Sequence, residues 1–135
     1  MLHLASCDPS LRGFQTIKKA PVTSLQLAKA IASFASDKKA EQITVLDMRK
    51  VANFCDFFVL CTGTSSRQVR AIADGIDDGF AQYGIKIRYK HGLSDGHWAI
   101  LDIGDVVTHI FDAETREFYG LEYLWQDAKR VNWEK

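Results

Sequence analysis

The chain has 135 residues, enough for a single domain that buries roughly two-thirds of the surface of its unfolded form. Hydrophobic residues make up 47% of it and charged residues 25%, and seventeen Lys and Arg balance seventeen Asp and Glu. This neutral total gives no electrostatic reason to expect broad binding to nucleic acid or anionic membranes, and no segment approaches the roughly 20 apolar residues of a membrane span.

The N-terminal part of the chain divides into a leader and a helix. Residues 1–22 are aperiodic and broken by Pro and Gly, which predicts a loosely ordered leader. Thr23 or Ser24 then offers an N-cap for a helix that should end near Lys38. Its apolar positions recur at near-helical spacing: Leu25, Leu27, Ala28, Ile31, Ala32 and Phe34.

Two apolar runs predict the next strands. Ile43–Met48 is rich in β-branched and apolar residues, and Asp56–Thr62 is almost continuously apolar, as expected of a central strand buried on both faces. Cys55 and Cys61 are therefore interpreted as small core residues rather than nucleophiles. With Cys7 they make an odd number of cysteines and no secretory signal is recognisable, which predicts reduced thiols and a cytoplasmic protein.

A second helix follows the central strand. Gly63–Gln68 leaves that strand, and Ser65 or Ser66 is the expected N-cap. One apolar stripe runs along the helix, formed by Val69, Ile72, Ala73, Ile76 and Phe80. Gly84 stands where a helix-terminating glycine belongs. Free N–H groups at the helix start could bind an anion, but the segment lacks the lysine and glycine spacing of a phosphate loop, so a plain cap is favoured.

The next predicted strand, Ile85–His91, alternates apolar or aromatic residues with a basic row of Lys86, Arg88 and Lys90. Basic side chains guard an edge strand against pairing, and we favour this interpretation over contact with RNA phosphates because the total charge is neutral. A strand, a Gly-Thr-Ser-Ser turn and a helix also open nucleotidyltransferase folds. Those enzymes need magnesium-binding carboxylates on the next strand, and this strand has none.

The most informative stretch is a predicted hairpin with Gly104-Asp105 as its two-residue turn. This register pairs Ile103 with Val106, Asp102 with Val107, Leu101 with Thr108, Ile100 with His109, Ala99 with Ile110, and Trp98 with Phe111. One face then carries Ala99, Leu101, Ile103, Val106, Thr108 and Ile110, and is expected to be the core face. The other carries Trp98, Ile100, Asp102, Val107, His109 and Phe111, large side chains of the kind found at protein–protein contacts. A slip of one residue would exchange the faces.

The histidines do not predict a metal site. His91, His97 and His109 fall at a strand end, in a loop and on another strand, without the fixed spacing of zinc ligands. His109 and Asp102 could form an acid–base pair, but no nucleophile accompanies them, so a hydrogen-bonded sheet histidine is favoured. The chain also lacks the short motifs of metalloproteases, phosphate-loop enzymes and serine hydrolases.

The C-terminal segment, Glu114–Ala128, predicts one or two short helices that dock on the sheet, interrupted at Gly120. Its apolar positions are Phe118, Leu121, Leu124, Trp125 and Ala128. Residues 129–135 are expected to fray. The predicted organisation is a leader over 1–22, one α/β domain over 23–130 and a tail over 131–135.

Three ordered motifs give the chain a family resemblance. They are L-D-M-R followed by F-C-D-F-F-V-L-C-T-G-T-S-S-R-Q-V-R-A-I-A-D, then H-W-A-I-L-D-I-G-D-V-V-T-H-I-F-D, then R-E-F-Y-G-L-E-Y-L-W-Q-D-A. Together they closely resemble the ribosomal silencing factor (Iojap) family over about residues 23–130. The resemblance implies a compact α/β domain with a mixed sheet of about five strands flanked by helices, similar to a catalytically empty nucleotidyltransferase fold.

The resemblance also implies a function that needs no catalysis or cofactor. A family member binds the large ribosomal subunit at the intersubunit face, through its fourteenth ribosomal protein, and represses translation by obstructing the small subunit. Organelle relatives look like assembly factors for the large subunit, and some members dimerise when free. A contact with ribosomal RNA would be secondary. The alternative functions are a nucleotide-binding or nucleotidyltransferase-type enzyme and an assembly factor of the large subunit.

The family motifs also point to the partner-binding residues. Trp98, Leu101, Asp102 and Asp105 are the main expected contacts. Four further residues are expected to support them: His109, Phe111, Arg116 and Tyr119. Leu101 also lies on the predicted core face, so the two expectations conflict at that position.

Overall fold

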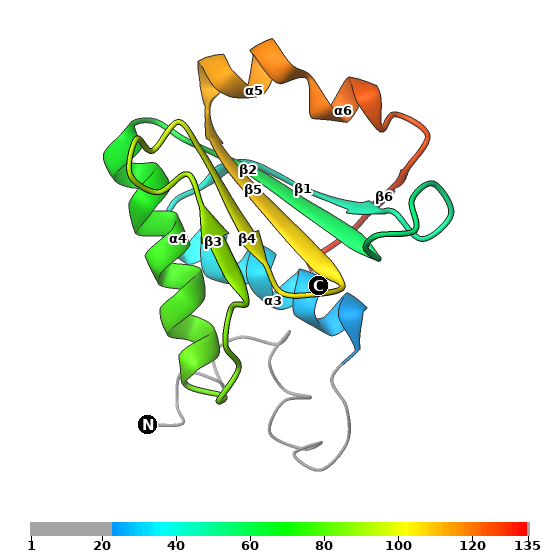
Figure 1. Cartoon of the computed structure of the whole chain (residues 1–135), viewed down its shortest axis with the longest axis horizontal. Coiled ribbons are helices and arrows are strands. Elements are labelled where there is room, and N and C mark those ends of the chain that lie inside the picture. Colours follow the sequence, from blue (N-terminus) through cyan, green and yellow to red (C-terminus); the bar gives the residue numbers. More distant parts are fainter. Residues whose placement is uncertain (1–22, 135) are drawn as a thin grey trace.

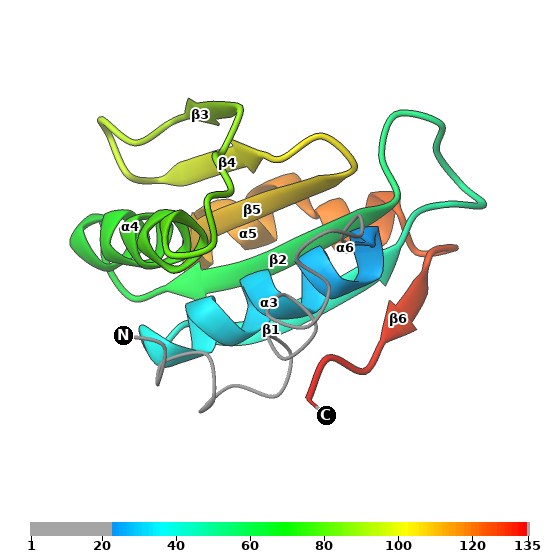
Figure 2. The same cartoon turned by 90° about the horizontal axis from the view of Figure 1, so that it is seen from below.

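A computed structural model of the chain describes residues 23–134, and the predicted leader lies outside this range (Figure 1). The described residues form one mixed sheet in the order β3-β4-β5-β2-β1-β6. Its strands are β1 (Glu41–Asp47), β2 (Phe57–Gly63), β3 (Tyr89–His91), β4 (Trp98–Asp102), β5 (Val106–Asp112) and β6 (Lys129–Val131). The helices are α3 (Ser24–Asp37), α4 (Ser66–Ala81), α5 (Ala113–Tyr119) and α6 (Leu121–Leu124). Figures 1 and 2 show α3 and α4 on one face of the sheet and α5 and α6 on the other.

Strand β2 lies in the middle of the sheet, as its apolar sequence predicts. All seven of its residues are buried, and it pairs antiparallel with β1 and parallel with β5. A strand covered by helices on both faces has no polar side, which explains the continuous apolar run. Cys61 lies within this strand and Cys55 just before it, and both are buried, so their interpretation as core residues is confirmed.

The β4–β5 hairpin has the predicted register. Trp98 lies opposite Phe111 and Asp102 opposite Val107, and Ile103 N–H donates to the Val106 carbonyl at 3.0 Å. Gly104 in the turn has φ +91°, a backbone conformation that glycine adopts without strain. The aliphatic face packs into the main core with α3 and α4, so the predicted core face is confirmed.

The two long helices begin and pack as their sequences predict. Thr23 caps α3 in a capping box with Gln26, and Ser65 caps α4 by accepting from the backbone N–H of Gln68. All five residues of the predicted α4 stripe are buried. The helices approach closely because Gly79 leaves room for the Phe34 ring, which would lie 2.6 Å from a Cβ at that position.

Two predicted segments differ in the structure. The strand predicted over Ile85–His91 contains only Tyr89–His91, because Ile85 is bonded to the end of α4, where its N–H donates to the Phe80 carbonyl. The strand lies at a sheet edge, where basic side chains were predicted to prevent pairing with another strand. Lys90 forms an ion pair with Asp77 of α4.

The prediction that residues 129–135 fray is wrong for 129–131. These residues form β6, which pairs antiparallel with β1, so the sheet has six strands rather than about five. Trp133, just beyond β6, packs against the main core. A three-residue strand carries too little periodicity to be read locally, and its partner lies about 85 residues away in the chain. The free edge of β1 supplies the hydrogen-bonding groups that order it.

Candidate functional site

The candidate site lies on the sheet face opposite α3 and α4. Here an aromatic cluster brings together Phe58 of β2, Trp98 of β4, His109 and Phe111 of β5, and Tyr119 of α5. Ring centroids are 4.6 Å apart for Trp98 and Tyr119, 5.2 Å for Trp98 and Phe111, and 4.7 Å for Phe58 and His109. Side chains alternate across a strand, so the residues that leave the aliphatic core point here. We call these five residues the aromatic cluster.

Among the residues that the strands contribute to the aromatic cluster, Trp98 is the one that is partly exposed. Its indole Nε1–H donates to His109 Nδ1 at 3.1 Å, and the ring contacts those of Phe111 and Tyr119. Strand β4 has only the short β3 between it and the sheet edge, and the short α5 covers the sheet incompletely. The indole is therefore fixed in orientation and still presents surface to solvent.

His109 is a buried, neutral histidine. Burial lowers its pKa to about 4, because the protonated ring would lose its hydration without gaining an acceptor. Since Nδ1 accepts from Trp98, the neutral ring carries its proton on Nε2, which has no hydrogen-bond partner within residues 23–134. The acid–base pair with Asp102 is not formed, because Asp102 Oδ1 accepts from the Gly104 N–H of the turn at 2.7 Å. The favoured interpretation, a hydrogen-bonded sheet histidine, is confirmed.

Helix α5 is fixed at its start by Asp112, whose carboxylate accepts from the N–H of Thr115 at 2.8 Å and lies 2.7 Å from His97 Nδ1. Burial acts to raise the Asp112 pKa, but the bonds from Thr115 and His97 together outweigh it and lower that pKa. The hydrogen bond between His97 and Asp112 also raises the pKa of His97. Helix α5 then ends at Gly120 (φ +55°), which separates it from α6 as predicted.

Four of the eight predicted partner contacts are inside the protein. Leu101 and Phe111 have no exposed surface, and His109 and Arg116 are each 7% exposed. In this structure Leu101 and Phe111 present no surface to a partner, and His109 and Arg116 present little. Leu101 was expected both to contact a partner and to lie on the core face. It belongs to the core shared with α3 and α4, as the hairpin register predicts.

The other four predicted contacts reach the surface. Trp98 and Tyr119 lie next to each other, whereas Asp102 and Asp105 lie at the β4–β5 turn. The side chain of Asp105 is exposed, and its backbone carbonyl accepts from the N–H groups of Asp56 and Phe57 at 2.6 and 3.2 Å. The structure thus divides these residues into an aromatic pair and an acidic turn.

The sequence missed a set of exposed apolar side chains close to the aromatic cluster. Phe118 and Leu124 were expected to dock on the sheet but are exposed, because only Leu121, Trp125 and Ala128 of that pattern pack against it. Phe54 is exposed in the loop before β2 and contacts Trp125 and Phe58, with centroid separations of 6.0 and 6.1 Å. We call the exposed set the apolar rim, and it contains Phe54, Phe118, Tyr123 and Leu124.

Other kinds of site find little support in the described part of the chain. No group of three His, Cys, Asp or Glu residues within 23–134 could hold a metal ion. At the start of α4, the backbone N–H of Thr64 donates to Gln68 Oε1 at 2.6 Å, and Ser65 caps the helix. Two of the N–H groups at this helix start, those of Thr64 and Gln68, are thus already paired with side chains of the same segment. None of the helices in this range is long and apolar enough to cross a membrane.

Comparison with known families gives one clear match. A family described as "Ribosomal silencing factor during starvation" matches residues 21–135. Among individual proteins, the chain is 40% identical over 102 residues to the ribosomal silencing factor of Bacillus subtilis, covering 76% of this chain and 86% of that protein. It is 37% identical over 113 residues to the one from Halalkalibacterium halodurans, covering 84% and 97%.

Solved structures show the same fold. An X-ray structure of a Chromobacterium violaceum protein superposes with a TM-score of 0.75 at 27% identity, covering 84% of this chain and 94% of that one. A crystal structure from Bacillus halodurans gives a TM-score of 0.70 at 36% identity, covering 79% and 97%.

A plant protein is also similar in sequence. The chain is 36% identical over 110 residues to the chloroplastic protein Iojap of maize, of which it covers 46%.

Proposed function

The chain belongs to the ribosomal silencing factor family, and from this membership we propose that it binds the large ribosomal subunit at its intersubunit face. The proposed partner there is the fourteenth ribosomal protein of that subunit. A protein of this size held on the intersubunit face obstructs the small subunit and so represses translation. Steric obstruction needs no turnover, so the proposed function requires no catalytic site.

The observation that carries the proposal is the partly exposed pair of Trp98 and Tyr119, held 4.6 Å apart and flanked by the apolar rim. Trp and Tyr are enriched among the few residues that supply most of the affinity at protein interfaces. An anchor that is already oriented loses little side-chain freedom on binding, and the Trp98–His109 hydrogen bond provides this orientation. Exposed Asp105 at the edge of the same hairpin offers a charge for a basic group of the partner.

The same surface suggests self-association of the free protein. A second copy docked on the aromatic pair would cover the same apolar side chains that we propose for the ribosome. Dimerisation and ribosome binding would then compete, and we propose that the ribosome-bound form is a monomer. We further propose that these events occur in the cytoplasm.

Cosedimentation with purified subunits tests large-subunit binding. The full chain should comigrate with isolated large subunits and not with small subunits, and Trp98→Ala or Tyr119→Ala should weaken comigration at least tenfold. Tyr89→Ala is the matched control, because Tyr89 is 55% exposed and Tyr119 is 52% exposed but Tyr89 lies on the edge strand β3. Comigration with small subunits alone, or equal losses in both tyrosine variants, would contradict the proposal.

A photo-cross-linker identifies the partner. We would replace exposed Phe118 by p-benzoylphenylalanine, irradiate the complex with large subunits and identify the cross-linked protein by mass spectrometry. The expected product is a cross-link to the fourteenth ribosomal protein that is absent when the same group replaces Tyr89. A dominant cross-link to another protein or to ribosomal RNA would overturn the choice of partner.

A further inference from the structure

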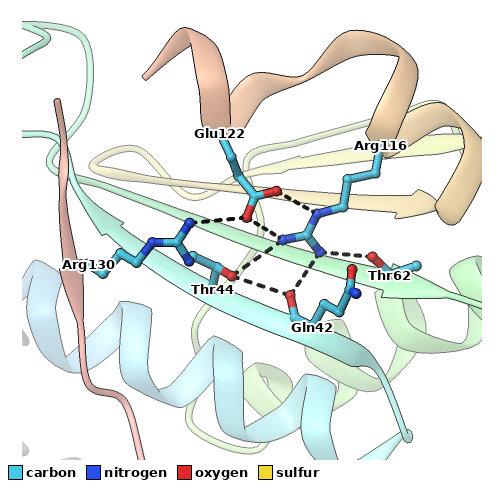
Figure 3. A network of polar contacts seen from close by, with 6 residues as sticks. All are labelled: Gln42, Thr44, Thr62, Arg116, Glu122 and Arg130. Carbon is cyan, nitrogen blue, oxygen red and sulfur yellow. Dashed lines mark hydrogen bonds and ion pairs between the residues drawn. The ribbon is translucent and has the colours of Figure 1, made fainter. Parts of the chain in front are cut away.

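Arg116 is the most heavily bonded buried cation of the described chain (Figure 3). It extends from α5 towards the edge of the sheet, and its guanidinium donates in three directions. Nη1 donates to the Gln42 carbonyl and to Thr62 Oγ1, each at 2.8 Å, and Nη2 donates to Thr44 Oγ1 at 3.3 Å. Nε and Nη2 donate to the two carboxylate oxygens of Glu122 at 3.1 and 2.8 Å. One side chain therefore connects α5 with β1, β2 and α6.

The backbone of β1 is shaped to receive this cation. The pairing of β1 with β2 shifts register between Glu41 and Thr44, and Gln42 within this bulge has φ +49°. A non-glycine residue seldom adopts that conformation, which persists where surrounding contacts hold it. Here the Gln42 carbonyl accepts from Arg116 instead of joining the regular strand pairing. Bulges of this kind often redirect a backbone group near a functional site.

Glu122 completes the network from α6. The hydrogen bonds from Arg116 lower its pKa, so it stays ionised at neutral pH and balances the buried cation. Arg130 of β6 approaches the same carboxylate at 3.8 Å, but its side chain is 67% exposed. A buried ion pair adds little net stability compared with a well-packed apolar contact, yet its planar, forked geometry fixes direction closely. The network is therefore better suited to fixing the position of α5 and α6 than to increasing overall stability.

Tyr119 lies three residues after Arg116, at the end of the same short helix. Helix α5 has seven residues and is held at its start by Asp112, so its other end depends on contacts made by its own side chains. Arg116 makes most of the polar contacts there, and one turn later Tyr119 packs on Trp98. We propose that Arg116 is a positioning residue that holds Tyr119 against Trp98, and thereby shapes the surface that binds the ribosome. This inference rests on the function proposed above.

A double-mutant cycle on large-subunit binding tests the inference. The variants are Arg116→Lys, Tyr119→Ala and the two combined, with Arg130→Lys as the matched control at the exposed edge of the network. A lysine keeps the charge but cannot donate in all the directions that Arg116 uses. Arg116→Lys should weaken binding about tenfold, Arg130→Lys should leave it unchanged, and the double variant should bind no more weakly than Tyr119→Ala alone. If the double variant lost affinity by the product of the two single losses, the substitutions would act independently and the inference would be overturned.

A second measurement uses the free protein. Fluorine NMR of the chain labelled with 5-fluorotryptophan gives a resonance for each tryptophan, and the Trp98 signal is the one lost in Trp98→Phe. Arg116→Lys should shift this signal and leave that of Trp133 in place, whereas a purely stabilising role would lower the unfolding temperature and move neither. An unmoved Trp98 signal in the folded variant would overturn the inference.

These two measurements separate the inference from the proposed function. If the unmodified chain fails to bind large subunits, the proposed function fails, while the fluorine signal still reports whether Arg116 positions Tyr119. If Arg116→Lys does not fold, Glu122→Gln replaces it. That variant removes the charge opposite Arg116 and keeps the side-chain shape, and the same shift of Trp98 is expected.

Discussion

Trp98 and His109 are joined by a hydrogen bond that runs diagonally across the β4–β5 hairpin, from indole Nε1 to imidazole Nδ1 at 3.1 Å. In the strand register Trp98 lies opposite Phe111, two residues beyond His109, so the two side chains reach each other along the face rather than straight across. The bond orients the partly exposed tryptophan and fixes the tautomer of the buried histidine. The side chain that we propose for partner binding and a core side chain thus depend on each other.

Trp98→Phe tests this dependence through stability. The substitution keeps an aromatic ring but leaves both nitrogens of His109 without a partner among the described side chains, so the free energy of unfolding should fall by about 1–3 kcal/mol. Urea denaturation followed by circular dichroism measures it. In a His109→Leu background the same substitution should cost clearly less, because no buried ring nitrogen is left unpaired. Equal costs in the two backgrounds would show that the hydrogen bond is not responsible.

Acidification should destabilise the protein through His109. Its pKa is about 4 in the folded chain and about 6.5 when unfolded, so between these values the unfolded chain binds more protons and stability falls as pH falls. Over the whole interval this amounts to about 3 kcal/mol. His97 has the opposite sign, because its pKa is raised by Asp112 and its contribution is lost as pH rises through the folded pKa.

Urea midpoints between pH 4.5 and 7.5 measure these two contributions. The His109→Leu variant should lose most of the slope between pH 4.5 and 6.5, whereas His97→Gln should retain it. Below about pH 4.5, protonation of Glu122 and Asp47, whose pKa values are lowered by Arg116 and Arg49, should destabilise all variants alike. An unchanged slope in His109→Leu would contradict the assignment.

Gly92→Ala and Gly84→Ala separate backbone conformation from close packing. Both glycines have positive φ, +79° and +73°, so an alanine should cost about 1 kcal/mol at either position. A Cβ at Gly84 would meet nothing within 4 Å, but at Gly92 it would lie 1.9 Å from the carbonyl oxygen of Trp98. Thermal unfolding should therefore show a much larger loss for Gly92→Ala, which must also displace Trp98. Similar losses in the two variants would contradict this account.

The buried cysteines should be protected from thiol reagents. Burial raises the pKa of Cys61 to about 12, and burial together with the carboxylates of Asp56, Asp102 and Asp105 raises that of Cys55 to about 11. The reactive thiolate is therefore scarce at pH 8. In a Cys7→Ser variant, reaction with a disulfide reagent should be negligible in the native state and should reach two thiols per chain in urea. Rapid labelling without urea would show that one of these cysteines is exposed.

Much of the fold follows from local sequence patterns. The apolar run of β2, the stripe of α4 and the caps at Thr23 and Ser65 act within a few residues of each other, and the structure agrees with each of them. The hairpin register was also predictable, because a two-residue turn at Gly104-Asp105 fixes every pair that follows. The candidate site was found only in part: Trp98 and Tyr119 reach the surface, whereas Phe111 and Arg116 do not.

The sequence alone therefore determined the main elements, the core face of the hairpin and the family resemblance, because short-range periodicity and ordered motifs carry that information. Only the tertiary structure decided that β6 joins β1, that Arg116 is buried, and that Phe118 is exposed. These outcomes depend on groups far apart in the chain. Arg116 bonds to Gln42 across 74 positions, and no local pattern specifies which surface a short helix will cover.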